Sequence, residues 1–121
     1  LLSKIQDTKA DVAVIELGAS PLEPYNGDIA FEELKSCVKC IVLCASDPYA
    51  VYGVMKSFNL KPDIVSGIAT NTFAGAELIE KLCSVKAMNL IDPRTAEELR
   101  KILSSKLDMT LDLREVQEEE A

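Results

Sequence analysis

The chain has 121 residues, 48% of them hydrophobic, and a formal net charge of −7. Its length suits one domain with a single core, and its longest uninterrupted apolar stretch, residues 40–45, is far too short to cross a bilayer, which takes about 20 residues. The negative charge disfavours nucleic acid as a partner, and the absence of His rules out histidine-based catalysis and histidine metal ligands.

The first residues lack the basic and apolar segments of a secretory signal, so we expect a cytoplasmic protein. Residues 1–8 are expected to form a helix that is part of the fold. Four short apolar runs rich in Val, Ile, Leu and Cys follow, as is typical of strands covered on both faces. They lie at residues 11–17, 39–45, 63–69 and 86–91. Apolar residues at helical spacing occur between and after these runs, at residues 28–36, 48–58, 72–82 and 95–107.

This alternation of strands and helices predicts an α/β fold, a three-layer sandwich in which a mainly parallel four-stranded sheet lies between two helical layers, as in Rossmann-like and P-loop-like proteins. We expect one domain over residues 1–108 and a solvated, mobile acidic tail over residues 109–121. The chain begins with Leu instead of Met, which suggests the C-terminal part of a longer protein.

A short polar segment follows each apolar run, in the sequences ELGAS, ASDP, ATNT and IDPR. Open parallel sheets bind ligands at the carboxyl ends of their strands, where helix N-termini also present free N–H groups. This edge is the candidate site, and no catalytic residue or metal ligand can be named within it. Its candidate ligand-binding residues are Glu16, Gly18, Ala19, Ser20, Asp47, Asn71 and Asp92.

Several of these residues also have a purely structural interpretation. Asp47 and Asp92 each precede a proline, which is typical of helix capping, and a TAEE capping box at Thr95 competes with Asp92 as the helix start. Asn71 either caps the helix at 72–82 or hydrogen-bonds a ligand. Glu16 either serves the site, because a buried carboxylate needs a partner, or extends past the covered part of the sheet and is solvated.

Glycines and cysteines add further expectations. Gly53 lies in the middle of an expected helix, which indicates close packing against the sheet. The CVKC sequence at 37–40 has the spacing of a redox or metal motif, but Cys40 begins an expected strand and no second pair completes a zinc site. Buried, unreactive cysteines are therefore the favoured interpretation. The glycines expected at turns or close backbone approaches are Gly18, Gly27, Gly67 and Gly75.

Three segments resemble a known group of proteins. DVAVIELGAS (11–20) resembles the D-hydrophobic-E-G-x-G/A-S segment in the second half of dethiobiotin-synthetase-like P-loop nucleotidases and of a related prokaryotic family of unknown function. CIVLCASD (40–47) resembles their next strand, and LKPDIVSGIATNTFAG (60–75) resembles their D-hydrophobic-G-hydrophobic-x-N stretch before a helix. The resemblance extends over residues 11–92.

The resemblance implies that Glu16 lies near the magnesium ion and phosphates or the substrate, that Gly18 to Ser20 form a loop beside it, and that Asn71 contacts a nucleotide base. Many relatives continue with Lys and Asp after this asparagine, where this chain reads NTFA, and no G-x-x-x-x-G-K-S/T loop occurs here. In those families the loop lies upstream, so this chain alone is not expected to hydrolyse ATP or GTP.

Two functions remain open from the sequence. The first is a domain that contributes to a nucleotide or phosphate-ligand site, with a nucleotide and Mg in a full-length protein and the main phosphate anchor in a missing N-terminal domain. The second is a non-catalytic domain that binds a small molecule or forms a homo-oligomer. Neither nucleic acid nor a membrane is an expected partner.

Overall fold

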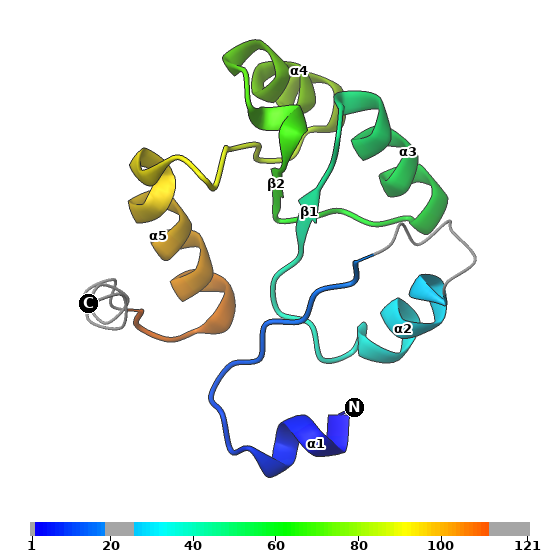
Figure 1. The fold of residues 1–121 in the computed structure, drawn as a ribbon, viewed down its shortest axis with the longest axis vertical. Coiled ribbons are helices and arrows are strands. Elements are labelled where there is room, and N and C mark those ends of the chain that lie inside the picture. Colours follow the sequence, from blue (N-terminus) through cyan, green and yellow to red (C-terminus); the bar gives the residue numbers. More distant parts are fainter. Residues whose placement is uncertain (1, 19–25, 112–121) are drawn as a thin grey trace. The chain divides into compact units, whose positions relative to one another are not determined.

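A computed structural model of the protein describes residues 2–18 and 26–111. The chain divides into two compact units, unit 1 (Leu1–Ser36) and unit 2 (Cys37–Ala121), whose elements Figure 1 colours along the chain. The single domain expected over residues 1–108 stays a prediction. Most of the acidic tail, from residue 112 onward, lies outside the described residues.

The described part of unit 1 contains two helices, α1 (Leu2–Asp7) and α2 (Gly27–Leu34), close to the bounds that the sequence predicts. Residues 12–18 have no regular secondary structure, although a strand was expected at 11–17. Val14 in this stretch is 97% exposed. A strand needs a paired neighbour, and the described part of unit 1 contains no strand that could provide one.

Unit 2 is built around two parallel strands, β1 and β2, paired so that Val42 lies opposite Ile64 and Cys44 opposite Ser66. Ala87 forms a single parallel bridge with Val65 on the other edge of β2. The mixed α/β architecture with parallel strands is therefore confirmed, whereas the described residues contain two strands and a bridge instead of four strands. The elements are β1 (Val42–Cys44), α3 (Pro48–Phe58), β2 (Ile64–Ser66), η1 (Ile68–Thr70), α4 (Phe73–Cys83), η2 (Pro93–Thr95) and α5 (Ala96–Leu107).

The main core lies on one face of this sheet. Because side chains alternate along a strand and the pairing is in register, Leu43, Val65 and Ala87 point to the same face. There they pack with Val51 of α3 and Ile79 of α4, both of which are completely buried. Burial of one such side chain contributes about 1.5–3 kcal/mol, so these contacts fix α3 and α4 firmly to the sheet.

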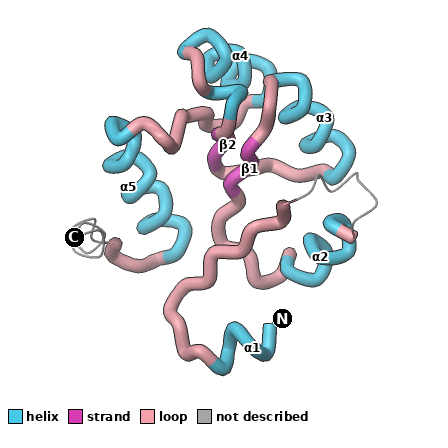
Figure 2. Tube along the Cα trace, in the orientation of Figure 1, coloured by secondary structure: helices cyan, strands magenta, loops and turns pink. Residues whose placement is uncertain are grey.

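The opposite face is covered unevenly. Ile64, Ser66 and Met88 point to it and are buried, and Leu90 N–H donates to the Ser66 hydroxyl (3.2 Å). Figure 2 shows α5 and α3 on opposite sides of β1 and β2. Val42 and Cys44, on the same face of β1, are exposed. This face is therefore covered over β2 and open over β1.

Two expectations about small residues are corrected here. The cysteines were expected to be buried, which is confirmed for Cys83 but wrong for Cys37 and Cys44, because Cys37 lies in a turn and Cys44 on the open face of β1. The expectation that Gly53 packs closely against the sheet is also wrong, because a Cβ atom there would meet no heavy atom within 4 Å. Gly67 and Gly75, in contrast, both lie against backbone atoms, as expected.

Candidate functional site

The carboxyl ends of β1 and β2 lie at one edge of unit 2. Figure 1 shows both strands running upward, with the starts of α3 and α4 beyond their ends. Asp47 follows β1, Asn71 follows β2, and Asp92 follows the segment that bridges to β2 through Ala87. The three predicted residues of unit 2 therefore each follow one of three parallel segments, as the sequence predicts.

Asp47 caps α3. Its Oδ1 atom accepts the N–H groups of Tyr49 and Ala50 (both 2.9 Å), and the Ser46 hydroxyl donates to Oδ2 (3.2 Å). These hydrogen bonds lower the pKa of the Asp47 carboxyl, and the bond from Ala50 N–H has the largest effect. The capping interpretation is confirmed, and a negative charge already lies at the N-terminus of α3.

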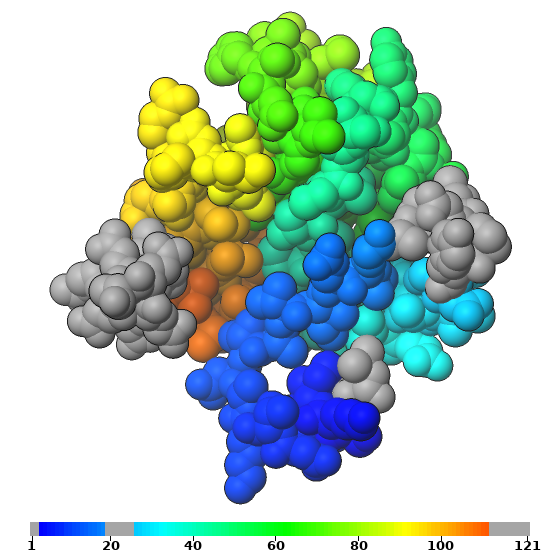
Figure 3. Space-filling view, viewed as in Figure 1, coloured from blue at the N-terminus to red at the C-terminus, as the bar shows by residue number. Residues whose placement is uncertain are grey.

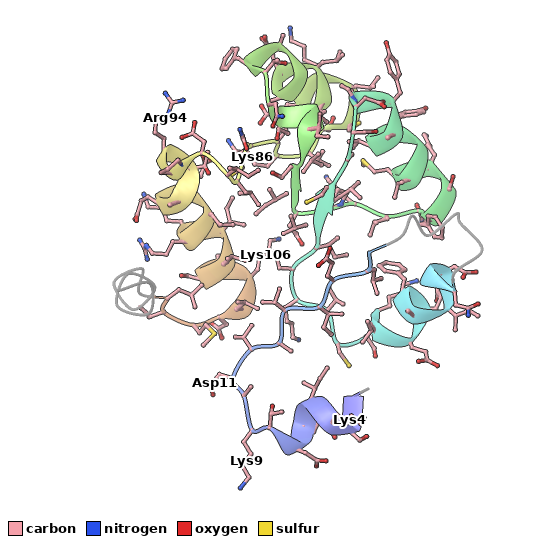
Figure 4. The ribbon with its side chains drawn as sticks, viewed as in Figure 1. Lys4, Lys9, Asp11, Lys86, Arg94 and Lys106 are labelled. Carbon is pink, nitrogen blue, oxygen red and sulfur yellow. The ribbon has the colours of Figure 1, made fainter. Side chains whose placement is uncertain are left out.

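Asp92 caps the short turn η2 and binds an arginine. Its Oδ1 atom accepts Arg94 N–H (2.9 Å), and the Arg94 guanidinium reaches Oδ2 (2.7 Å). The bond from that side chain is the main reason why the pKa of Asp92 is lowered. Figure 4 shows Arg94 at the outer surface, beside the start of α5.

The prediction of a TAEE capping box at Thr95 is wrong. The Thr95 hydroxyl donates backward, to the carbonyl oxygens of Asn89 (3.0 Å) and Asp92 (2.8 Å), and makes no capping hydrogen bond to α5. Because η2 already turns the chain, α5 continues directly from it and needs no separate cap. Thr95 thus fixes the turn that leads into α5.

Among the three predicted residues of unit 2, Asn71 is the one whose side chain stays available. It does not cap α4, because Thr72 directly precedes the helix and its hydroxyl accepts Gly75 N–H (3.0 Å). The Asn71 side chain is exposed and makes no hydrogen bond within the described part of the chain. Its amide can therefore both donate to and accept from a ligand.

Exposed apolar side chains accompany these polar residues, and the sequence analysis did not identify them. Phe73 follows Thr72 and Ile68 begins η1, so both belong to the segment around Asn71. The helical spacing could have predicted the exposure of two of them, because Tyr49 and Phe73 lie outside the apolar stripes of their helices. The exposed fractions are 74% for Tyr49, 70% for Ile68, 87% for Phe73 and 85% for Ile91.

The remaining predicted residues belong to unit 1. Glu16 and Gly18 are exposed and lie in the segment without regular structure, and Ala19 and Ser20 lie outside the described residues. A Cβ atom at Gly18 would meet no heavy atom of the described residues within 4 Å, so none of them makes the close backbone approach that was expected there. The roles that the resemblance implies for these four residues stay predictions.

A second polar cluster lies at the amino ends of the strands. The Asp63 carboxylate accepts Ile41 N–H (2.8 Å) and binds Lys106 of α5 (3.0 Å), which Figure 4 labels beside the strands. The pKa of the Cys40 thiol is raised, mainly by burial and secondly by the negative charge of Asp63. A raised thiol pKa disfavours redox chemistry. Sequence reasoning missed this cluster because its members are far apart in the chain.

Lys86 forms a similar link between helices. Its ammonium group lies 2.8 Å from Glu98 of α5 and 4.0 Å from Glu80 of α4, whose carboxylate also accepts Ala87 N–H (3.2 Å). The hydrogen bond to Glu98 is the main cause that raises the pKa of Lys86. Figure 3 shows the atoms at the start of α5, in yellow, beside those of the α4 region, in green.

The described residues contain no cluster of three or more Cys, Asp or Glu side chains that could hold a metal ion. Among the helices that the structure describes, none is long and apolar enough to cross a membrane. Comparison of the chain with protein families, with characterised proteins and with solved structures finds no match.

Proposed function

We propose that unit 2 is a non-catalytic recognition domain that binds the base of a nucleotide, or a similar planar heterocycle, at the carboxyl edge of its parallel strands. The observation that carries this proposal is the Asn71 amide, which is exposed and has no partner among the described residues, in a segment that also contains the exposed side chains of Ile68 and Phe73. An amide reads the hydrogen-bonding edge of a heterocycle, and apolar side chains cover its faces. The resemblance described above supports the same role for Asn71.

The charges at this edge favour a base over a phosphate group. Asp47 and Asp92 already satisfy the N–H groups that a phosphate would use at the starts of α3 and η2, and both carry negative charge. A phosphate at either turn would have to displace its own cap. We therefore propose that the phosphates of a nucleotide are held elsewhere, in a part of the protein that provides a phosphate-binding loop.

The experiment is a titration of the ¹⁵N-labelled chain with adenosine and guanosine, which lack phosphates, at up to about 5 mM, enough to detect a millimolar dissociation constant. We expect chemical-shift changes at the backbone amides of residues 68–73 and at the Asn71 side-chain NH₂. Asn71→Ala should remove these changes. Gln6→Ala, which removes another exposed amide, should leave them intact.

Two outcomes would contradict this proposal. Inorganic phosphate alone could shift the same amides, in wild type and in Asn71→Ala alike, which would assign the edge to an anion. Alternatively, the nucleosides could shift nothing while the sedimentation coefficient rises with protein concentration, which would assign the exposed apolar side chains to self-association.

We also propose the finer architecture, a four-stranded, three-layer Rossmann-like sandwich in which residues 11–17 form the fourth strand. The backbone groups of residues 41 and 45 form hydrogen bonds toward β2. Because backbone groups alternate in direction along a strand, the N–H and C=O groups of Val42 and Cys44 face the other edge of β1, which has no partner strand among the described residues. Hydrogen exchange tests the proposal: the amides of residues 12–17 should be protected as strongly as those of β1. Exchange at the rate of an unstructured peptide would contradict it.

A further inference from the structure

Helix α5 is attached to unit 2 in a different way from α3 and α4. α3 and α4 each contribute completely buried side chains to the core, Val51 and Ile79. No residue of α5 is buried to that extent. The apolar stripe of α5, formed by Leu99, Ile102, Leu103 and Leu107, is only partly covered. The apolar contribution that holds this helix in place is therefore smaller than for the other two.

Ion pairs hold α5 near both of its ends. Lys86 binds Glu98 (2.8 Å) at the first turns, and Lys106 binds Asp63 (3.0 Å) at the last turn. Both lysine side chains are nearly half exposed. Pairs that water reaches to this degree contribute little to stability, and salt screens them further.

One buried group opposes the docking of α5. The hydroxyl oxygen of Ser104 is inaccessible to solvent and has no hydrogen-bond partner among the residues that the structure describes. A buried hydroxyl without a partner costs free energy that it recovers when water reaches it. Ser104 therefore favours the state in which α5 has moved away from the sheet.

We infer that α5 is a releasable strap over the second face of the sheet. It opens as a unit about the turn that Thr95 fixes, while β1, β2, α3 and α4 stay folded. Ile64, Ser66 and Met88 are the buried residues that point to this face, and opening is expected to raise their exposure to solvent. The strap is independent of the ligand proposed above, because its contacts lie on this face and at the amino ends of the strands.

Site-resolved hydrogen exchange of the whole chain tests this inference. In the wild type, the amides of residues 100–107 should exchange at least about tenfold faster than those of residues 79–83 in α4, because regions with few buried contacts open at lower free energy. If the two groups exchange at the same rate through one common opening, α5 belongs to the main folding unit and the inference is overturned.

A pair of adjacent serines provides the matched variants. Ser104→Ala removes the buried hydroxyl, whereas Ser105→Ala removes an exposed one, and both substitutions raise helix propensity equally. We expect Ser104→Ala to slow the exchange of α5 about fivefold more than Ser105→Ala does, without any change in α4. Equal effects of the two substitutions, or faster exchange in Ser104→Ala, would overturn the inference.

Discussion

Replacement of Gly67 by alanine is expected to destabilise unit 2 by about 3 kcal/mol or more. Gly67 has φ 86° and ψ −167°, a backbone conformation that essentially only glycine adopts. An added Cβ atom would also lie 2.8 Å from both the nitrogen and the oxygen of Ala45. The fall in the urea midpoint of unfolding measures the loss.

The clash at Gly67 cannot relax cheaply, because both backbone groups of Ala45 are in use. Ala45 N–H donates to the Ser66 carbonyl (3.1 Å), and the Ala45 carbonyl accepts Ala69 N–H (3.0 Å). A shift of Ala45 away from the new methyl group would break these bonds between the ends of β1 and β2. The strand ends that carry the candidate site would separate.

Gly18→Ala is the control for this prediction. A Cβ atom at Gly18 meets no heavy atom within 4 Å, and Gly18 does not have positive φ. Its substitution should leave the urea midpoint of unit 2 unchanged. A Gly67→Ala protein that unfolds at the wild-type midpoint would mean that the chain does not turn in this way after β2.

The sequence predicted the helices well because their signals are local. Spacing of apolar residues, and prolines after Asp47 and Asp92, are properties of a few neighbouring residues. The predicted range 48–58 agrees with α3 at both ends, and the range 72–82 is displaced from α4 by one residue at each end. The cap at Asp47 followed from the same local chemistry.

Features that depend on distant partners were not predicted. A run such as residues 11–17 reads as a strand, but only a paired neighbour makes it one. The exposure of Cys44 depends on which helix covers β1, and the contact between Asp63 and Lys106 joins residues that no local pattern relates. None of these properties is encoded within one short segment.

The candidate site was partly predictable for the same reason. Parallel strands bring the segments after them to one edge, so the placement of Asp47, Asn71 and Asp92 follows from the order of the elements. Which of them is free depends on one-residue differences in where each helix starts. Thr72 caps α4 and leaves Asn71 available, whereas Asp47 and Asp92 are themselves used as caps.

Two glycines within helices should respond to alanine in opposite directions. Both substitutions gain helix propensity of up to about 1 kcal/mol. At Gly53 of α3 the new methyl group meets open space, so Gly53→Ala should stabilise the protein by about 0.5–1 kcal/mol. At Gly75 of α4 the methyl group would overlap the carbonyl oxygen of Ala69 and lie 3.1 Å from the Thr72 hydroxyl.

The Gly75→Ala protein is therefore expected to lose about 2 kcal/mol net, because overpacking against a backbone atom costs more than the propensity gain. Ala69 cannot move away freely, since it is buried and its N–H group is bonded to Ala45. Urea unfolding of both variants measures the two effects on one scale. If Gly75→Ala were as stable as Gly53→Ala, the first turn of α4 would not pack against η1, and the segment that carries Asn71 would lack its support.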